Sequence, residues 1–420
     1  MTPNPDVQTS PHADLTAQKE PLSNEPPLKA PLSNEPLFKT LSLGFAALDA
    51  GLRRDGSPED QFPVPGLDLL RGSGFWGAGG DTALTGPQLL RLMRLVGRAS
   101  LPLGRLFEGH VNALALISAY GTAGQRARTA QEVREGRLFG VWNTEGPDGV
   151  QLLGASSDVR SDTSSDPGGL TLQGAKTFAS GGLQVTRPLL PVDRQGERQL
   201  VLLRADAPES VAREVPGSWQ PLGMAATGSV KLDFSGSRVE QDDLIGRPGD
   251  YYRQPMFSAG ALRFCAVQQG GAERLLDEAR AYLHRLGRGH DEVQALRFAG
   301  CWTGLQGAAL LLAEGERLER ACLAGKVSEA RLLAQVDAVR LATEDACLAL
   351  LEASERAVGA RGLLEPEPFS RLIRDLRMYL RQPAPDAARL RLGHWVMNDW
   401  LLGEWSLDEG SLDESGSEDD

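Results

Sequence analysis

The sequence predicts an α+β protein in which two helical regions flank a central β region. Apolar residues recur every three or four positions over 37–135, change to short alternating runs over 138–245, and return to the helical period over 259–402. The predicted divisions are a disordered tail 1–36, an N-terminal helical domain 37–135, a central β-barrel domain 136–248, a C-terminal four-helix-bundle domain 249–403 and an acidic disordered tail 404–420.

The two predicted tails have compositions that cannot bury much surface. The first carries a near-repeat, Pro21-Leu-Ser-Asn-Glu-Pro26 and Pro31-Leu-Ser-Asn-Glu-Pro36. The second, Glu404 to Asp420, holds eight acidic residues and no basic ones, and so carries most of the net charge of −12. The rest of the chain is near neutral, without the basic stripe of a nucleic-acid-binding protein.

Composition also bears on compartment and metal sites. The four cysteines lie in helical patterns without CxxC spacing, which predicts buried reduced thiols and no metal site: Cys265, Cys301, Cys322 and Cys347. The N-terminus lacks the pattern of a signal peptide, and no run of eighteen apolar residues occurs. We therefore expect a cytoplasmic protein without membrane insertion.

The elements follow from the periodicity, region by region. In the first helical region the pattern is interrupted by the Gly- and Pro-rich stretch Gly72 to Pro87. In the β region, apolar runs separated by turn residues predict strands within Leu170–Phe178, Gln199–Leu203 and Val230–Phe234, with turns at Ser161–Gly169 and Asp193–Gly196. In the last region the predicted helices are Phe264–Leu286, Val293–Cys322, Ser328–Val358, Phe369–Arg381 and Asp386–Leu402, which would bury their apolar stripes as a bundle.

Two pairs of segments carry a resemblance to a known family. They are Val141-Trp-Asn-Thr-Glu145 with Gly174-Ala-Lys-Thr-Phe-Ala-Ser180, and Gly359-Ala-Arg-Gly362 with Arg374-Asp375. In this order they resemble the flavin-binding signatures of acyl-CoA dehydrogenases, whose fold also has a β domain between helical domains. The resemblance spans about residues 85–400 and implies FAD as the cofactor.

The β-region segments stand where the family contacts the flavin ring. The resemblance implies that Trp142, Asn143 and Thr144 contribute backbone and hydroxyl contacts, although Gly146 replaces the family's proline. Phe178 and Ser180 replace a tryptophan and a threonine, which keeps an aromatic wall and a hydroxyl beside the ring.

The resemblance assigns the remaining cofactor contacts to the helical region. The family's Arg-x-x-Phe-Gly element, with a Gln eleven positions after the Arg, is degraded here to Arg285-Leu-Gly-Arg288 with Gln294. Arg285, Arg288 and Gln294 would then lie at the adenine and pyrophosphate side of FAD. In the family the glycine-rich turn, here Gly359 to Gly362, reaches the flavin of a neighbouring subunit, which implies a homodimer or homotetramer.

The usual catalytic carboxylate is missing. Relatives place a glutamate where this chain has Pro383, or in other relatives where it has Leu262. Asp386, three residues after Pro383, is a weak candidate for a relocated base, with a helix cap as the competing interpretation. His394 and His110 are lone histidines in helical patterns and are more typical of packed residues than of catalysts.

The main hypothesis is thus an FAD-dependent oxidoreductase acting on the CH–CH group of an acyl thioester or related carbonyl compound, with a relocated or absent base and an unidentified redox partner. One alternative is a flavin-dependent monooxygenase, because Arg374-Asp-Leu-Arg377 also resembles a run in monooxygenases of this fold. The other is a non-catalytic member that kept the fold.

Overall fold

The computed structural model describes residues 34–55, 61–80, 84–154, 169–381 and 384–399. The acidic tail and nearly all of the N-terminal tail that the sequence predicts lie outside this part, as do Pro383 and most of the predicted turn Ser161–Gly169. Among the described helices, none combines the length and the apolar character that a membrane crossing requires.

Within the described residues, five helices precede the strands: α1 (Glu35–Asp55), α2 (Val64–Gly72), α3 (Gly86–Ala99), α4 (Leu101–Tyr120) and α5 (Ala123–Arg134). The break between α2 and α3 falls in the Gly- and Pro-rich stretch that the sequence marks as an interruption. Side chains cap three of the starts. Thr85 and Thr122 each form a capping box with the glutamine three residues later, and the Ser100 hydroxyl accepts from the Leu103 N–H at the start of α4.

The strands form two hydrogen-bonded sheets. They are β1 (Phe139–Val141), β2 (Gln151–Leu153), β3 (Leu170–Gln173), β4 (Ala175–Ala179), β5 (Arg187–Arg194), β6 (Glu197–Leu202), β7 (Arg213–Glu214), β8 (Val230–Asp233), β9 (Arg238–Val239) and β10 (Leu244–Ile245). The larger sheet has the order β10-β6-β5-β2-β3-β9, with β1 parallel to β5, and the smaller has the order β4-β8-β7. The prediction of one barrel is thus only partly right.

The turn predicted at Asp193–Gly196 is the hairpin between β5 and β6. Gln195 and Gly196 both have positive φ, 57° and 90°, which is the backbone of a two-residue turn that matches strand twist. The hairpin pairs the whole of β6 with Leu189–Arg194 of β5 in antiparallel register. The side of β5 opposite this hairpin accepts β1 and β2 in parallel.

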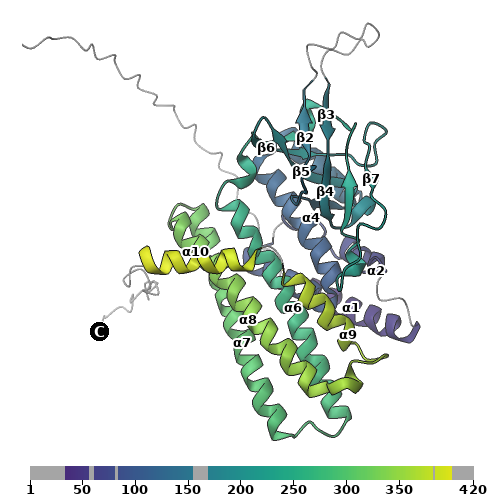
Figure 1. Cartoon of the computed structure of the whole chain (residues 1–420), viewed down its shortest axis with the longest axis vertical. Helices are drawn as coiled ribbons and strands as arrows, with labels where there is room; N and C mark the ends of the chain where they lie inside the picture. Colours follow the sequence, from purple (N-terminus) through teal and green to yellow (C-terminus); the bar gives the residue numbers. More distant parts are fainter. Residues whose placement is uncertain (1–33, 56–60, 81–83, 155–168, 382–383, 400–420) are drawn as a thin grey trace, which may run out of the picture. The chain divides into compact units, whose positions relative to one another are not determined.

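The part of the last region that the structure describes contains three long helices and two shorter ones: α6 (Met256–Arg285), α7 (Glu292–Leu323), α8 (Glu329–Gly362), α9 (Phe369–Tyr379) and α10 (Pro385–Asn398). In Figure 1, α6, α7 and α8 run side by side, with α9 against α6 and α8 and with α10 across α8. Helix α6 begins at Met256 rather than Phe264, because Pro255 stands at its N-cap and the helix starts directly after it.

Helix α3 also packs against α6, so the N-terminal helices and the bundle share one interface. Glycine makes this contact close: a Cβ on Gly97 would lie 2.1 Å from the Val267 carbonyl oxygen, and one on Gly270 would lie 2.0 Å from that of Arg94. No side chain larger than hydrogen fits at such backbone approaches.

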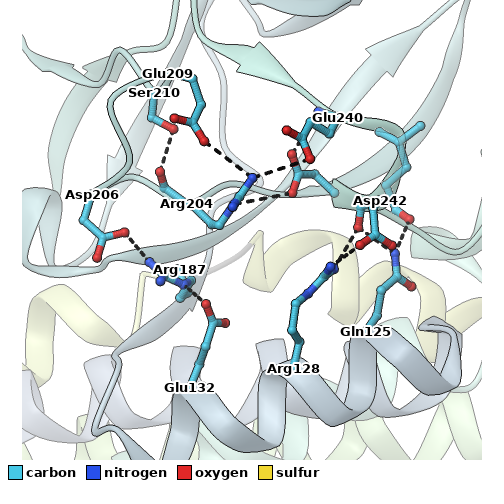
Figure 2. A network of polar contacts seen from close by, with 12 residues as sticks. Gln125, Arg128, Glu132, Arg187, Arg204, Asp206, Glu209, Ser210, Glu240 and Asp242 are labelled. Carbon is cyan, nitrogen blue, oxygen red and sulfur yellow. Dashed lines mark hydrogen bonds and ion pairs between the residues drawn. The ribbon is translucent and has the colours of Figure 1, made fainter.

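Polar contacts fasten α5 to the larger sheet, as Figure 2 shows. The Gln125 amide donates to the carbonyl oxygens of Asp242 and Leu244, at 3.0 and 2.9 Å. Further along α5, Glu132 accepts a hydrogen bond from Arg187 of β5. These bonds hold the β region against the helices that precede it.

The β region is also fixed to the bundle by the Arg-Asp motif. The Asp375 carboxylate on α9 accepts a hydrogen bond from the Met224 backbone N–H at 2.5 Å. A Cβ on Gly223 would lie 2.1 Å from the Arg374 carbonyl oxygen. The motif therefore docks α9 against the turn before β8.

Candidate functional site

A cavity of about 980 Å³ opens where the ends of β1 and β4 meet α4, α6, α8 and α10. Its size lies within the range of pockets that bind small molecules and cofactors, roughly 300–1,000 Å³. Four sequence-predicted cofactor residues line it together: Trp142, Asn143, Thr144 and Phe178. The structure thus brings the two β-region segments to one place.

On the β-region wall, the indole N–H of Trp142 donates to the Ser180 carbonyl oxygen at 3.0 Å, which ties the end of β1 to the end of β4. Ser180 itself is buried and does not line the cavity, because its hydroxyl shares a hydrogen bond with the Ser229 hydroxyl at 2.9 Å. The hydroxyl predicted to face the flavin is therefore engaged inside the β region.

Phe178 presents its ring to the cavity from a strained backbone. Its φ of 53° lies in the left-handed region, which is uncommon for a bulky residue. The side chain is 47% exposed, and its ring contacts Trp219 edge-to-face at 6.0 Å. An aromatic face held open to a cavity in this way suits stacking by a planar ligand.

Polar side chains of α4 form a second wall that the sequence reasoning missed. Arg105 donates to the Glu108 carboxylate at 2.7 Å, and Asn112 donates to the same carboxylate from one turn further on. The Asn112 carbonyl in turn accepts from Arg263 of α6. The available signal was the spacing of three and four between polar residues inside the apolar run Leu101–Ile117.

Across the cavity, α8 and α10 meet through an ion pair. Arg391 donates two hydrogen bonds to Asp337, at 2.9 and 2.6 Å, and Arg340 reaches the same carboxylate at 3.4 Å. Burial lowers the pKa of Arg340, against the effect of Asp337. The Arg340 guanidinium also lies 5.9 Å from the Phe264 ring centroid.

Between these polar walls the cavity is apolar. The side chains that face it with hydrocarbon, thioether or aromatic groups include Phe257, Ala261, Phe264, Leu333, Met378 and Trp395. A ligand here would meet apolar contacts over most of its body and polar groups at its ends.

The five cofactor residues predicted in the helical region do not line this cavity. Arg285 donates to both oxygens of Glu367, at 2.9 and 2.7 Å. Arg288 pairs with Asp291, the N-cap residue of α7, at 3.2 Å. Both guanidinium groups are engaged by neighbouring carboxylates of the same chain.

The remaining three lie at the same end of the bundle. The buried Gln294 side chain accepts from Arg297 at 2.6 Å. Gly359 interrupts α8 with φ 61° and ψ −176°, and a Cβ there would meet nothing within 4 Å. Gly362 packs near Phe369. The contact of the Gly359–Gly362 turn with a neighbouring subunit's flavin stays a prediction, as does the place of Gln294 at the adenine side.

Neither of the two positions where the dehydrogenases carry their base, Pro383 and Leu262 here, holds an acidic residue. Leu262 is 1% exposed and packs near Gly315 of α7. Asp386 is exposed in the first turn of α10 and does not line the cavity, and its role as a relocated base stays a prediction. Because α10 begins at Pro385, the carboxylate lies beside the helix N-terminus, where its charge stabilises the helix.

The two candidate histidines are not in the cavity lining either. His394 is exposed on α10. His110 is buried, and its two ring nitrogens are both used: Nε2 bonds to the Trp76 carbonyl oxygen at 2.7 Å, and Nδ1 accepts from the Phe139 N–H at 3.1 Å. Burial lowers the pKa of His110 from 6.5 to about 4, so the neutral ring links α4 to β1.

Glu145, which follows Thr144, is structural. It pairs with Lys176 of β4 and with Arg198 of β6, the latter at 2.8 Å. Lys176 has no exposed surface, and burial lowers its pKa from 10.5 to about 8, against the effect of Glu145. This cluster orients the segment that carries Thr144.

No family model matches the chain. A dibenzothiophene monooxygenase of Rhodococcus erythropolis is 27% identical over 342 residues, which are 74% of this chain and 79% of that protein. Among solved structures, the dibenzothiophene monooxygenase TdsC of Paenibacillus sp. A11-2, in complex with FMN and indole, has a TM-score of 0.74 at 22% identity and covers 87% of this chain and 97% of its own. Methanesulfinate monooxygenase of Pseudomonas fluorescens has a TM-score of 0.72 at 18% identity, and the match covers 88% of this chain and 98% of that protein.

These likenesses show the fold. The α+β arrangement is consistent with the acyl-CoA dehydrogenase-like fold that the motifs predicted. The relatives named above are monooxygenases, however, and not the dehydrogenases that the motifs resemble.

Proposed function

We propose that this protein is a flavin-dependent monooxygenase that takes up reduced FMN and transfers one oxygen atom to a small aromatic substrate. The observation that carries the proposal is the acid content of the cavity. Among its described lining residues the carboxylates are Glu108 and Asp337, and guanidinium groups hold both of them. Neither stands at the two positions where the dehydrogenases carry their base, which are Pro383 and Leu262 in this chain.

The residues present fit a flavin. Phe178 offers a ring face, while Asn143 and Thr144 offer polar groups at the edge of the same wall. The buried Trp142 holds this wall together through its bond to Ser180. When bound, reduced flavin would supply two electrons, so that one atom of O₂ enters the substrate and the other leaves as water.

FMN is favoured over FAD by the state of the predicted adenine-side residues. Arg285 and Arg288 lie outside the cavity and pair with carboxylates of their own chain. A cofactor without an adenylate half needs neither of them. The FMN-bound relative supports the same choice.

The chain's own side chains would bind and orient the substrate. The apolar walls from α6, α8 and α9 exclude water from a flat ring system, and the polar groups of α4 meet one of its edges. The dibenzothiophene monooxygenases support an aromatic substrate. A separate reductase would have to supply the reduced flavin, and we propose a homo-oligomer in which the Gly359–Gly362 turn approaches the neighbouring subunit's flavin.

The test is oxygen consumption by the purified protein with an NADH-dependent flavin reductase, FMN and an aromatic heterocycle such as indole or benzothiophene. We expect a product containing one atom from ¹⁸O₂, formed only when reduced flavin is present. Phe178→Ala should weaken binding of reduced FMN by about 5- to 100-fold, the range of one lost aromatic stack. Leu222→Ala, which removes an exposed apolar side chain outside the cavity, is the matched control.

Anaerobic bleaching of the bound flavin by an acyl-CoA would contradict the proposal and restore the dehydrogenase hypothesis. A folded protein that binds neither FMN nor FAD, oxidised or reduced, would favour the non-catalytic alternative. Tighter binding of FAD than of FMN would overturn the choice of cofactor alone.

A further inference from the structure

We propose that the Glu108 carboxylate recognises a neutral N–H or O–H donor on the substrate, so that the cavity selects donor-bearing aromatic heterocycles over purely apolar ones. This inference rests on the proposed function for the reaction, but its evidence and its test concern binding alone.

The Glu108 carboxylate has more acceptor positions than the hydrogen bonds it receives from the described residues. The residue is 5% exposed and lines the cavity. One carboxylate oxygen accepts from Arg105 and the other accepts from Asn112. An ionised carboxylate has about four acceptor positions, so Glu108 can accept further hydrogen bonds from a molecule in the cavity.

Asn112, the polar neighbour of Glu108 on α4, cannot replace it as the acceptor. The Asn112 amide cannot turn to offer its oxygen to a ligand, because that oxygen accepts from Arg263 while its nitrogen donates to Glu108. On this part of the α4 wall, the described side chains therefore present Glu108 as the acceptor. The orientation of this row is fixed by two hydrogen bonds within α4 and by the bond from Arg263 of α6.

The charge of Glu108 favours a neutral ligand. Arg105 and Glu108 form an ion pair on one helix, at 2.7 Å, with 16% and 7% of their side chains exposed. The negative charge is thus already compensated in the protein. A ligand that brought a second cation would add an uncompensated charge, which is costly in a buried site, whereas a neutral donor adds none.

The rest of the cavity suits a flat apolar ring system. The α6 and α8 walls are apolar at Phe257, Phe264 and Leu333. A flat ring system would fill this part and place a ring N–H or a hydroxyl at the α4 wall. An isosteric ring without a donor would cover the carboxylate and give it no hydrogen bond, and covering a polar group in this way costs binding free energy.

The experiment compares ligands of matched shape. Calorimetry measures the dissociation constants of indole, 1-methylindole and benzothiophene for the full chain loaded with oxidised FMN, or for the chain alone if it binds no flavin. We expect indole to bind about 10- to 100-fold more tightly than the other two, the range for leaving one buried acceptor unpaired.

A double variant tests the residue. Arg105→Met with Glu108→Leu removes both charges together, and such replacements of buried ion pairs by apolar residues commonly keep the fold. We expect this variant to bind benzothiophene at least as tightly as indole. The control is Glu314→Leu with Arg317→Met, an i,i+3 pair of 2.8 Å on α7 outside the cavity, which should leave the indole preference unchanged.

Equal affinities of the three ligands for the unaltered chain, or no binding of indole, would overturn the proposal, and so would an indole preference that survives in the folded double variant. These outcomes do not depend on oxygen consumption. A chain that prefers indole but never incorporates oxygen would refute the monooxygenase function and leave the recognition by Glu108 standing.

Discussion

Protonation of His110 should destabilise the protein in mild acid. The ring stacks on Trp76 at 4.2 Å and is bonded at both nitrogens, one of which accepts from the Phe139 N–H. A proton on that nitrogen removes the acceptor and places a charge in a buried site. The link between α4 and β1, which form adjacent walls of the cavity, would be lost with it.

The magnitude follows from the two pKa values. The pKa of His110 is about 4 in the folded chain, because of burial, against an ordinary 6.5. The unfolded chain therefore takes up the proton first as the pH falls, so this stability is complete above pH 6.5 and is lost as the pH approaches 4. The whole effect is about 3 kcal/mol, and about 2 kcal/mol of it falls between pH 7 and pH 5.

The assay is urea unfolding followed by tryptophan fluorescence at several pH values between 7 and 4.5. We compare the unaltered chain with His110→Gln, and use His394→Gln, at an exposed histidine, as the control. The first variant should start less stable and lose about 2 kcal/mol less on going from pH 7 to pH 5. Parallel loss of stability in all three proteins would refute the reasoning.

Three further substitutions test other parts of the structure. The unaltered chain should gain stability as the pH rises from 8 toward 10.5, because the pKa of Lys176 is about 8 in the folded chain against an ordinary 10.5, so the unfolded chain keeps its proton longer. Lys176→Met should lack this gain. Urea midpoints at pH 8 and 9.5 measure the gain, and an equal gain in the variant would contradict the prediction. Gly223→Ala should lower the free energy of unfolding by about 3 kcal/mol, because its Cβ would lie 2.1 Å from the Arg374 carbonyl oxygen. Gly300→Ala, whose Cβ would meet nothing within 4 Å, should raise the free energy of unfolding by about 0.5–1 kcal/mol. Melting temperatures of the two variants that move in the same direction would contradict this prediction. Asp386→Ala should change turnover less than about twofold, because the residue lies outside the cavity; steady-state kinetics check it, and a tenfold fall in kcat would reinstate it as a base.

Local patterns were enough for much of the fold. The change of period from helix to strand and back, and the turn residues near Gly196, act over a few neighbouring positions, and the structure has those elements. The largest boundary error is at Met256, where a proline start extends α6 toward its N-terminus, and the ends of α8 and α10 each differ from the prediction by four residues.

For the site, the sequence by itself predicted that Trp142 and Phe178 lie close together, as they do in the cavity, and determined that Leu262 is no acid. Only the tertiary structure decided that Glu108 faces the same cavity and that Asp386 does not. The reason is physical: periodicity reports which face of a helix is buried, but the partners of a buried charge come from elements far apart in the chain. Their meeting depends on how those elements pack, which no local pattern records.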